Sequence, residues 1–148
     1  MANSKYASYF ALDPFFGIVM QGLAGEVDGD HYFETIAEGA VFEFRYVFPN
    51  FPTRIVGRAA LEALYSGYGD TTILHSGDAL VVHRSREPGV LIIEYEVHGK
   101  KLLTGKAYDN RFISVVTIKD RKIVHWRDYM GFAGRLRSGD WHDGLSYV

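Results

Sequence analysis

The second half of the chain holds four segments rich in β-branched and aromatic residues, and only short turns separate them. The segments cover residues 73–83, 90–98, 102–118 and 123–132. The breaks between them contain Gly, Pro or Asp, and such short turns join neighbouring strands in antiparallel fashion. The sequence therefore predicts a long antiparallel meander. Its longest strand, 102–118, must bend or twist strongly to remain in one sheet.

The first half of the chain has a different, mostly helical pattern. Asp13 is a plausible N-cap, and Pro14 suits the first turn of the helix that follows. A second, shorter helix is expected after Asp28-Gly29-Asp30, and a third has apolar residues at helical spacing. The expected helices cover residues 14–25, 31–38 and 58–68, and two strands are expected at 40–48 and 53–56.

Helices that precede a meander indicate the α+β class, with the N-terminal helices packed on one face of a strongly curved, mostly antiparallel sheet. We expect such a sheet, closed by helices, to form a cone-shaped pocket. The 148 residues suit a single domain spanning 1–148, with a core at about 13–130. The tail at 131–148 could cap the pocket mouth, reach a partner subunit or remain unstructured, and the sequence does not choose between these alternatives.

Composition excludes several classes of function. The net charge is −2 and no basic run is present, so nucleic-acid binding is not expected. No cysteine is available for a disulfide or a thiol nucleophile. No apolar run is long enough to cross a membrane and no signal segment is visible, so we expect a cytoplasmic protein. Aromatic residues make up 15% of the chain, which fits either a pocket for a lipophilic ligand or a well-filled core and dimer interface.

Asp128 is the first candidate for chemistry. Strand alternation places Trp126, Asp128 and Met130 on one face of the last strand. A carboxylate between Trp and Met would be partly desolvated, which raises its pKa toward neutrality and makes it useful as a general base or acid. The alternative is an aspartate that pairs with a neighbouring arginine on an exposed strand.

Tyr108 and Asn110 form the second candidate group. They alternate with Phe112 on the preceding strand, so all three face the hollow if Phe112 does. A phenol and an amide can both donate hydrogen bonds to a carbonyl or to a developing oxyanion. The alternative is a purely structural hydrogen-bonded pair.

Other ionisable residues are expected on the outer face of the sheet. Glu43 and Arg45 oppose a pair of phenylalanines, and Glu94, Glu96 and His98 oppose apolar neighbours. The histidines lack the spacing of metal ligands, and no phosphate-binding or dinucleotide motif is present. The sequence therefore predicts neither a metal site nor a cofactor.

Four segments carry a family resemblance. Residues 40–44, 54–61, 104–118 and 122–129 resemble the SnoaL-like group within the ketosteroid isomerase and nuclear transport factor superfamily. The resemblance implies the α+β fold and a homodimer that packs through the outer sheet face. It does not fix the reaction, because the superfamily contains isomerases, polyketide cyclases, epoxide hydrolases, dehydratases and non-catalytic binders.

The resemblance also implies which roles the candidates could have. SnoaL-like cyclases and limonene-type epoxide hydrolases use an aspartate near the place of Asp128. The latter also need an arginine and an aspartate where Tyr108 and Asn110 stand, so epoxide hydrolysis is the runner-up. The base of ketosteroid isomerase corresponds to Phe44, which cannot act as a base.

The sequence thus predicts a cofactor-free acid–base enzyme for a small lipophilic molecule, of isomerase, cyclase or dehydratase type. Asp128 would move the proton, and Tyr108 and Asn110 would hold the substrate oxygen. The predicted pocket wall consists of Phe44, Phe112, Trp126 and Met130. A limonene-type epoxide hydrolase and a non-catalytic binding or dimerisation module remain as alternatives.

Overall fold

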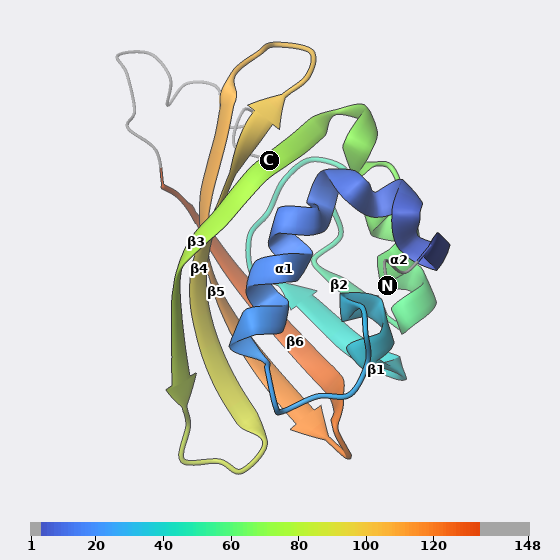
Figure 1. Ribbon diagram of the computed structural model, residues 1–148, viewed down its shortest axis with the longest axis vertical. Helices are drawn as coiled ribbons and strands as arrows, with labels where there is room; N and C mark the ends of the chain where they lie inside the picture. The colour runs from blue at the N-terminus through green and yellow to red at the C-terminus, as the bar shows by residue number, and fades with distance from the viewer. Residues whose placement is uncertain (1–3, 134–148) are drawn as a thin grey trace.

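The computed structural model describes residues 4–133 and contains, in that range, two α-helices, three short 3-10 helices and one six-stranded sheet (Figure 1). The helical elements are η1 (Ser4–Leu12), α1 (Asp13–Gly22), η2 (Tyr32–Thr35), α2 (Arg58–Tyr65) and η3 (Tyr68–Asp70). The strands are β1 (Ile36–Phe44), β2 (Arg54–Val56), β3 (Thr72–Arg84), β4 (Val90–Lys101), β5 (Ala107–Lys119) and β6 (Lys122–Phe132). Most of the predicted tail, residues 134–148, lies outside the described range.

The sheet has the order β2-β1-β6-β5-β4-β3. Strands β3 to β6 form the predicted antiparallel meander, and β1 lies parallel to β6. The short turn between β5 and β6, together with a register shift between Ile118 and Thr117, places Ser114 opposite Asp128. The predicted α+β class with a mostly antiparallel sheet is confirmed.

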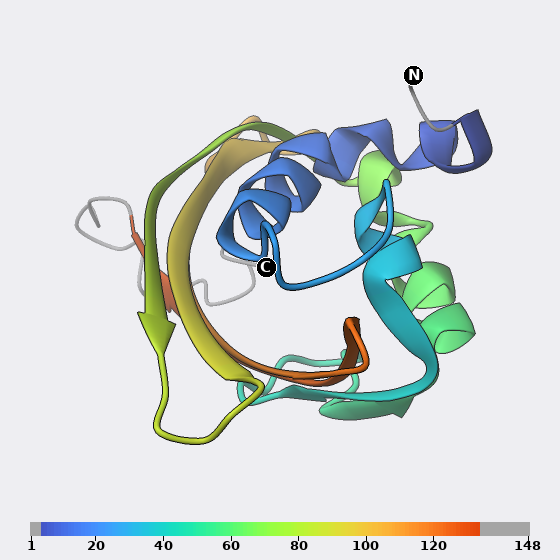
Figure 2. The same ribbon diagram turned by 60° about the horizontal axis from the view of Figure 1, so that its bottom comes forward.

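The helices cover one face of the sheet, as expected from the sequence. Helix α1 packs on β3 and β4, and α2 packs on β1 and β2 (Figure 2). The apolar residues of these helices can therefore meet the inner face of the sheet and share one core with it. Among residues 4–133, no helix combines the length and apolar character needed to cross a membrane.

The prediction of a strongly curved sheet was wrong. The sheet is open, with β2 and β3 as its two edges, and it is not strongly curled. The strand expected to bend most begins only at Ala107, because residues 102–106 form a turn in which Gly105 has a φ of +70°. Two of the four irregularities of register lie in the pairing of β3 with β4, and Ala79 of β3 has a positive φ. Helices and loops, rather than the strands alone, therefore complete the hollow.

The helix predicted at 31–38 is a single 3-10 turn. His31 caps it: its Nδ1 accepts a hydrogen bond from the Phe33 amide at 3.1 Å, and its own amide donates to Glu34 at 3.0 Å. Strand β1 then begins at Ile36, earlier than expected, and ends at Phe44. Its pairing with β6 overrides the local helical preference of this segment.

The other helix boundaries differ by a few residues. Asp13 is the first residue of α1 rather than its cap: the cap position belongs to Leu12, which makes no side-chain hydrogen bond, and Pro14 lies in the first turn as predicted. The helix predicted at 58–68 ends at Tyr65, and the 3-10 helix η3 follows. These shifts matter because η3 and the end of α2 lie beside the pocket described below.

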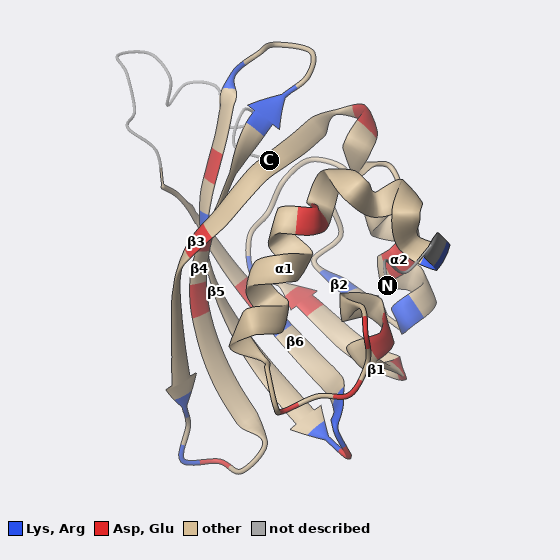
Figure 3. Cartoon of the chain, in the orientation of Figure 1, with Lys and Arg blue, Asp and Glu red and all other residues tan. Residues whose placement is uncertain are grey.

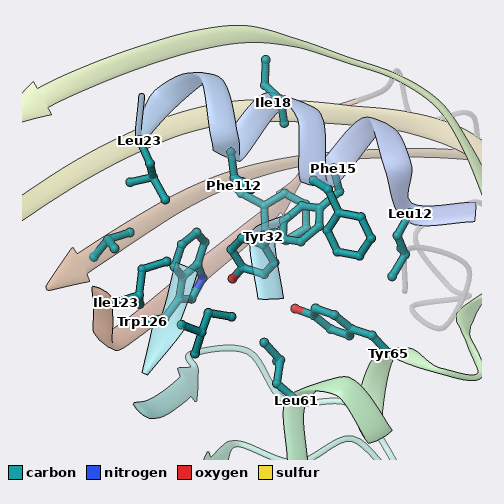
Figure 4. Packing of buried hydrophobic residues seen from close by; sticks show 14 of the residues in the cluster. Leu12, Phe15, Ile18, Leu23, Tyr32, Leu61, Tyr65, Phe112, Ile123 and Trp126 are labelled. Carbon is teal, nitrogen blue, oxygen red and sulfur yellow. The ribbon is translucent and has the colours of Figure 1, made fainter. Parts of the chain in front are cut away.

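Strand alternation correctly predicted which side chains face inward. Ile93, Tyr95 and Val97 of β4 are each at most 2% exposed, whereas Glu94 and Glu96 face the other way. The core joins these side chains to the helices (Figure 4). Its largest fully buried members, by volume, are Trp126, Tyr32, Tyr95, Phe33, Phe42 and Phe44.

Helix α1 lies close against the sheet at Gly77 of β3. A Cβ atom added there would lie 2.9 Å from the Pro14 carbonyl oxygen and 3.1 Å from the Ile18 side chain. We therefore expect Gly77→Ala to displace α1 and to lower the free energy of unfolding by about 1–3 kcal/mol, measured by urea denaturation. Gly17→Ala is the control, because nothing lies within 4 Å of a Cβ there, and it should be neutral or slightly stabilising. Equal effects of the two substitutions would contradict this packing.

Candidate functional site

A pocket lies between the inner face of the sheet, the N-terminal helices and the loop that follows β1. It encloses about 510 Å³ of space not occupied by atoms, part of it open to solvent. Figure 4 shows Phe15 beside Phe112, and Tyr65 entering from α2. The lining is mainly aromatic and aliphatic: Leu12, Phe15, Tyr46, Phe51, Tyr65, Tyr68, Leu74, Val97, Tyr108, Phe112, Asp128 and Met130.

Asp128 is the one charged residue among these lining residues. It points inward from β6 and is 3% exposed. Two donors bind the same carboxylate oxygen, Oδ1: the Ser114 hydroxyl at 2.5 Å and the Trp126 indole N–H at 2.7 Å. No donor to Oδ2 is found within residues 4–133, so this second oxygen is available to a ligand.

A second hydroxyl extends this network. The Tyr95 hydroxyl lies 2.9 Å from Ser114 Oγ, and both groups are buried. A serine hydroxyl has one hydrogen to donate, and when Asp128 is ionised that hydrogen is directed to the carboxylate. Tyr95 must then donate to Ser114. The chain Tyr95 to Ser114 to Asp128 therefore has a fixed direction in the ionised state.

Burial dominates the electrostatics of the site. Desolvation raises the pKa of Asp128 to about 7, although the hydrogen bonds from Ser114 and Trp126 lower it in part. At neutral pH the carboxyl group is thus present in both protonation states. A group with this property can accept a proton and return it in the same catalytic cycle.

Tyr108 and Asn110 lie where alternation predicted them, on the inner face of β5. Tyr108 lines the pocket, and its side chain is hydrogen-bonded to that of Asn110. Burial raises the pKa of Tyr108 to about 12, so its hydroxyl keeps its proton at neutral pH. Asn110 is fully buried and does not itself line the pocket.

The four predicted wall residues divide into two pairs. Phe112 and Met130 line the pocket. Trp126 and Phe44 are each 1% exposed and lie behind its surface. Trp126 reaches the site through its hydrogen bond to Asp128, and Phe44 supports the pocket by packing edge-on against Phe51, with ring centroids 5.3 Å apart.

Sequence reasoning missed the lining residues that come from helices and loops. Tyr46 follows β1, Tyr65 ends α2, and Tyr68 begins η3. Burial raises the pKa of all three tyrosines, so their hydroxyls act as neutral hydrogen-bond groups. The only signal in the sequence was the high aromatic content.

Ser114 was also missed, although its face could have been predicted, because it alternates with Phe112 on the inner side of β5. Its pairing with Asp128 could not have been predicted by counting from the turn, which would place Ser114 opposite Arg127. A register shift between Ile118 and Thr117 moves the pairing by one residue and brings the hydroxyl beside the carboxylate. Tyr95 could have been found from the same alternation on β4.

The outer face of the sheet carries a further group of charged residues. Glu43, predicted on this face with Arg45, is hydrogen-bonded to His125 at 2.6 Å. His98 Nδ1 lies 2.7 Å from Asp109 and its Nε2 lies 3.0 Å from Asp78. Burial lowers the pKa of His98, but these hydrogen bonds outweigh it and the pKa is raised.

One outer-face group has a geometry that could hold a metal ion, although spacing in the sequence predicted none. Ligand atoms of Asp78, Glu96 and His98 all lie within 4.8 Å of one another. The group lies on the face of the sheet opposite the pocket, and its histidine already pairs with carboxylates. It does not contribute to the chemistry available at Asp128.

Comparison with known proteins places the chain in a family. Residues 23–126 match the SnoaL-like domain. A curated relative from Bacillus subtilis (strain 168), the uncharacterized protein YesE, is 36% identical over 104 residues, which cover 70% of this chain and 71% of YesE. The chain belongs to the SnoaL-like domain family.

Solved structures share this SnoaL-like fold. A crystal structure from Bacillus subtilis named “Putative Isomerase” is 30% identical, covers 88% of this chain and 90% of its own, and has a TM-score of 0.66. A phenazine biosynthesis-related protein from Pseudomonas aeruginosa has a TM-score of 0.59 at 14% identity, covering 95% of this chain and 93% of its own. At that identity the second likeness shows the fold alone.

The burial of Asp128 predicts how the stability of the protein depends on pH. The folded-state pKa of about 7 lies above the ordinary aspartate pKa of about 4, so the folded protein binds more protons between these values and its stability falls as pH rises through that window. Asp128→Asn keeps an acceptor for Ser114 and Trp126 but carries no charge. We expect the variant to gain about 3 kcal/mol of unfolding free energy over the native protein between about pH 5 and pH 8.

Urea denaturation at both pH values measures this gain. Asp120→Asn is the control, since Asp120 lies exposed in the turn between β5 and β6. A stability difference between Asp128→Asn and the native protein that does not change with pH would show that Asp128 titrates normally.

Proposed function

We propose that this SnoaL-like protein is an acid–base enzyme that binds a small lipophilic molecule in the pocket and moves a proton with Asp128. The observation that carries the proposal is a buried carboxyl group, with a pKa near 7, in the wall of an otherwise apolar pocket. Perturbed carboxyl groups of this kind are typical of general bases and acids. The proposed proton transfer requires no cofactor.

The proposed step begins with ionised Asp128 and a substrate that has a carbonyl group. The free oxygen, Oδ2, takes a proton from the carbon next to the carbonyl, and the C–H electron pair moves into the carbonyl to form an enolate. Asp128 is then neutral and can return the proton to another carbon of the same molecule. That sequence is an isomerisation, and addition of the enolate to a second carbonyl would make it a cyclisation.

Tyr108 is the proposed partner of the substrate oxygen. It lines the pocket and keeps its proton at neutral pH, so it can donate a hydrogen bond to a developing oxyanion. Asn110 is hydrogen-bonded to Tyr108 and does not line the pocket, so its proposed role is to position the phenol. Phe112 and Met130 would contact the apolar body of the substrate, and Trp126 and Phe44 would support the wall from behind.

The names of the relatives agree with this reaction class. The Bacillus subtilis structure at 30% identity is named a putative isomerase, and a Pseudomonas putida structure with a TM-score of 0.60 is named a putative polyketide cyclase. In the proposed scheme both reactions begin with removal of a proton from the carbon next to a carbonyl group. These names support the class of reaction and leave the substrate open.

The alternatives receive less support. A limonene-type epoxide hydrolase needs an arginine beside its aspartate, whereas Asp128 is the one charged residue among the residues that line the pocket. A non-catalytic binding module has no need for a desolvated carboxyl group that costs the fold stability at neutral pH. The pocket itself fits either an enzyme or a binder, so turnover decides between them.

The predicted homodimer also remains a proposal. Ile113 and Tyr129 are neighbours on the outer face of β5 and β6, and they are 41% and 42% exposed. A second copy of the chain could cover these side chains.

Hydrogen–deuterium exchange at the carbon next to a carbonyl tests the proposal without knowledge of the natural substrate. With 2-tetralone in D₂O, followed by proton NMR, we expect exchange above background that rises with pH through about 7 and then levels off, because the ionised form is the base. Asp128→Asn should lower this rate by about 10²–10⁴-fold.

Asp120→Asn is again the matched control and should exchange at the native rate. Native-level exchange in Asp128→Asn would remove this residue from the mechanism. Absence of exchange by the native protein with 2-tetralone and related bicyclic ketones would favour the non-catalytic module.

A further inference from the structure

A second hollow opens beside the pocket. It encloses about 560 Å³, much of it open to solvent, and is lined by Phe51, Leu64, Gly67, Tyr68, Thr71 and Lys101. Phe51 and Tyr68 line both hollows. We name this second hollow the vestibule, because it adjoins the pocket that contains Asp128 at these two shared rings.

Lys101 provides the positive charge of the vestibule. It is the last residue of β4 and continues the inward-facing series of Tyr95 and Val97. Its ammonium group lies 3.2 Å from Thr72 Oγ1 and 5.5 Å from the centre of the Tyr108 ring. Lys101 therefore contacts a residue that itself lines the pocket. Figure 3 shows lysine and arginine gathered at the strand ends, including this end of β4.

No carboxylate neutralises this ammonium group within residues 4–133. Its contacts there are the neutral Thr72 hydroxyl and the face of the Tyr108 ring. Partial burial lowers the pKa of Lys101, and no neighbouring anion opposes that shift. A half-buried ammonium group is stabilised by an anion, and a ligand could supply one.

The two charged groups impose an orientation on a ligand. An anionic group placed beside ionised Asp128 would be repelled in a desolvated pocket, whereas the same group beside Lys101 would be attracted. The neutral, reactive part of the ligand would then face Asp128. The aromatic surface between them suits a flat apolar body.

We propose that Lys101 is an anion subsite at the mouth of the pocket, and that the substrate is an amphipathic organic acid whose carboxylate pairs with Lys101 while its apolar body extends toward Asp128. This inference rests on the proposed function in one respect, namely that the pocket takes a ligand. It adds the class of substrate and assigns the carboxylate to the vestibule.

A matched pair of ligands tests the subsite directly. 2-Naphthoate and 2-naphthamide share an apolar body and differ in charge. By isothermal titration calorimetry we expect the native protein to bind the carboxylate about tenfold more tightly than the amide, the usual gain from a charge-assisted hydrogen bond. Lys101→Met keeps the aliphatic stem and removes the charge, so it should abolish this preference by weakening naphthoate binding alone.

Two further variants control for folding and for general charge. Lys101→Arg retains the cation and should retain the preference for naphthoate. Lys100→Met removes an equal charge from the neighbouring, exposed position and should bind both probes as the native protein does.

Three results would each overturn the proposal: equal affinity of the native protein for both probes, a naphthoate preference that survives Lys101→Met, and failure of naphthoate to bind. The test reads binding alone, so its failure is distinguishable from failure of the acid–base proposal. If the protein exchanges 2-tetralone protons but shows no preference for naphthoate, the role of Asp128 as a base is supported and the anion subsite at Lys101 is refuted.

Discussion

The burial of one carboxylate, held at a single oxygen by Ser114 and Trp126, is the interaction on which the candidate site depends. Burial alone would drive the Asp128 carboxyl toward permanent neutrality, and two strong donors oppose that tendency. The balance leaves a group that can change its protonation state near neutral pH. Both donors use Oδ1, which leaves Oδ2 for the ligand. The same contacts therefore set the protonation and the orientation of the group.

The sheet and the elements that cover it contribute different parts of this environment. The strands fix the polar network, because Tyr95, Ser114 and Asp128 come from three adjacent strands in fixed register. Helices and loops supply much of the apolar enclosure that excludes water. The close approach of α1 to β3 at Gly77 couples the two parts, so the position of the helix affects the dielectric around the carboxylate.

Strand periodicity made much of the site predictable from the sequence. Alternation placed Asp128, Tyr108 and Asn110 on the inner face, and it placed Glu94 and Glu96 outside. A period of two, bounded by short turns, leaves one arrangement in which apolar side chains face a core.

Other features depend on tertiary contacts that local patterns do not encode. Pairing of β1 with β6 converted most of the predicted helix at 31–38 into a 3-10 turn and the start of a strand. The turn at 102–106 shortened the strand expected to curve the sheet. Tyr46 and Tyr68 enter the pocket from non-periodic segments, and Lys101 gains its importance from the loops that frame the vestibule.

A direct titration of the Asp128 carboxyl group tests the central claim most simply. Carbon-13 NMR of the ligand-free protein, labelled at the aspartate carboxyl carbons and assigned with Asp128→Asn, reports its protonation without any assumption about substrate. We expect a midpoint near pH 7, because the carboxyl group is desolvated within the pocket wall. A midpoint near the ordinary aspartate value of about 4 would show that water reaches this carboxylate, and it would contradict the proposed chemistry.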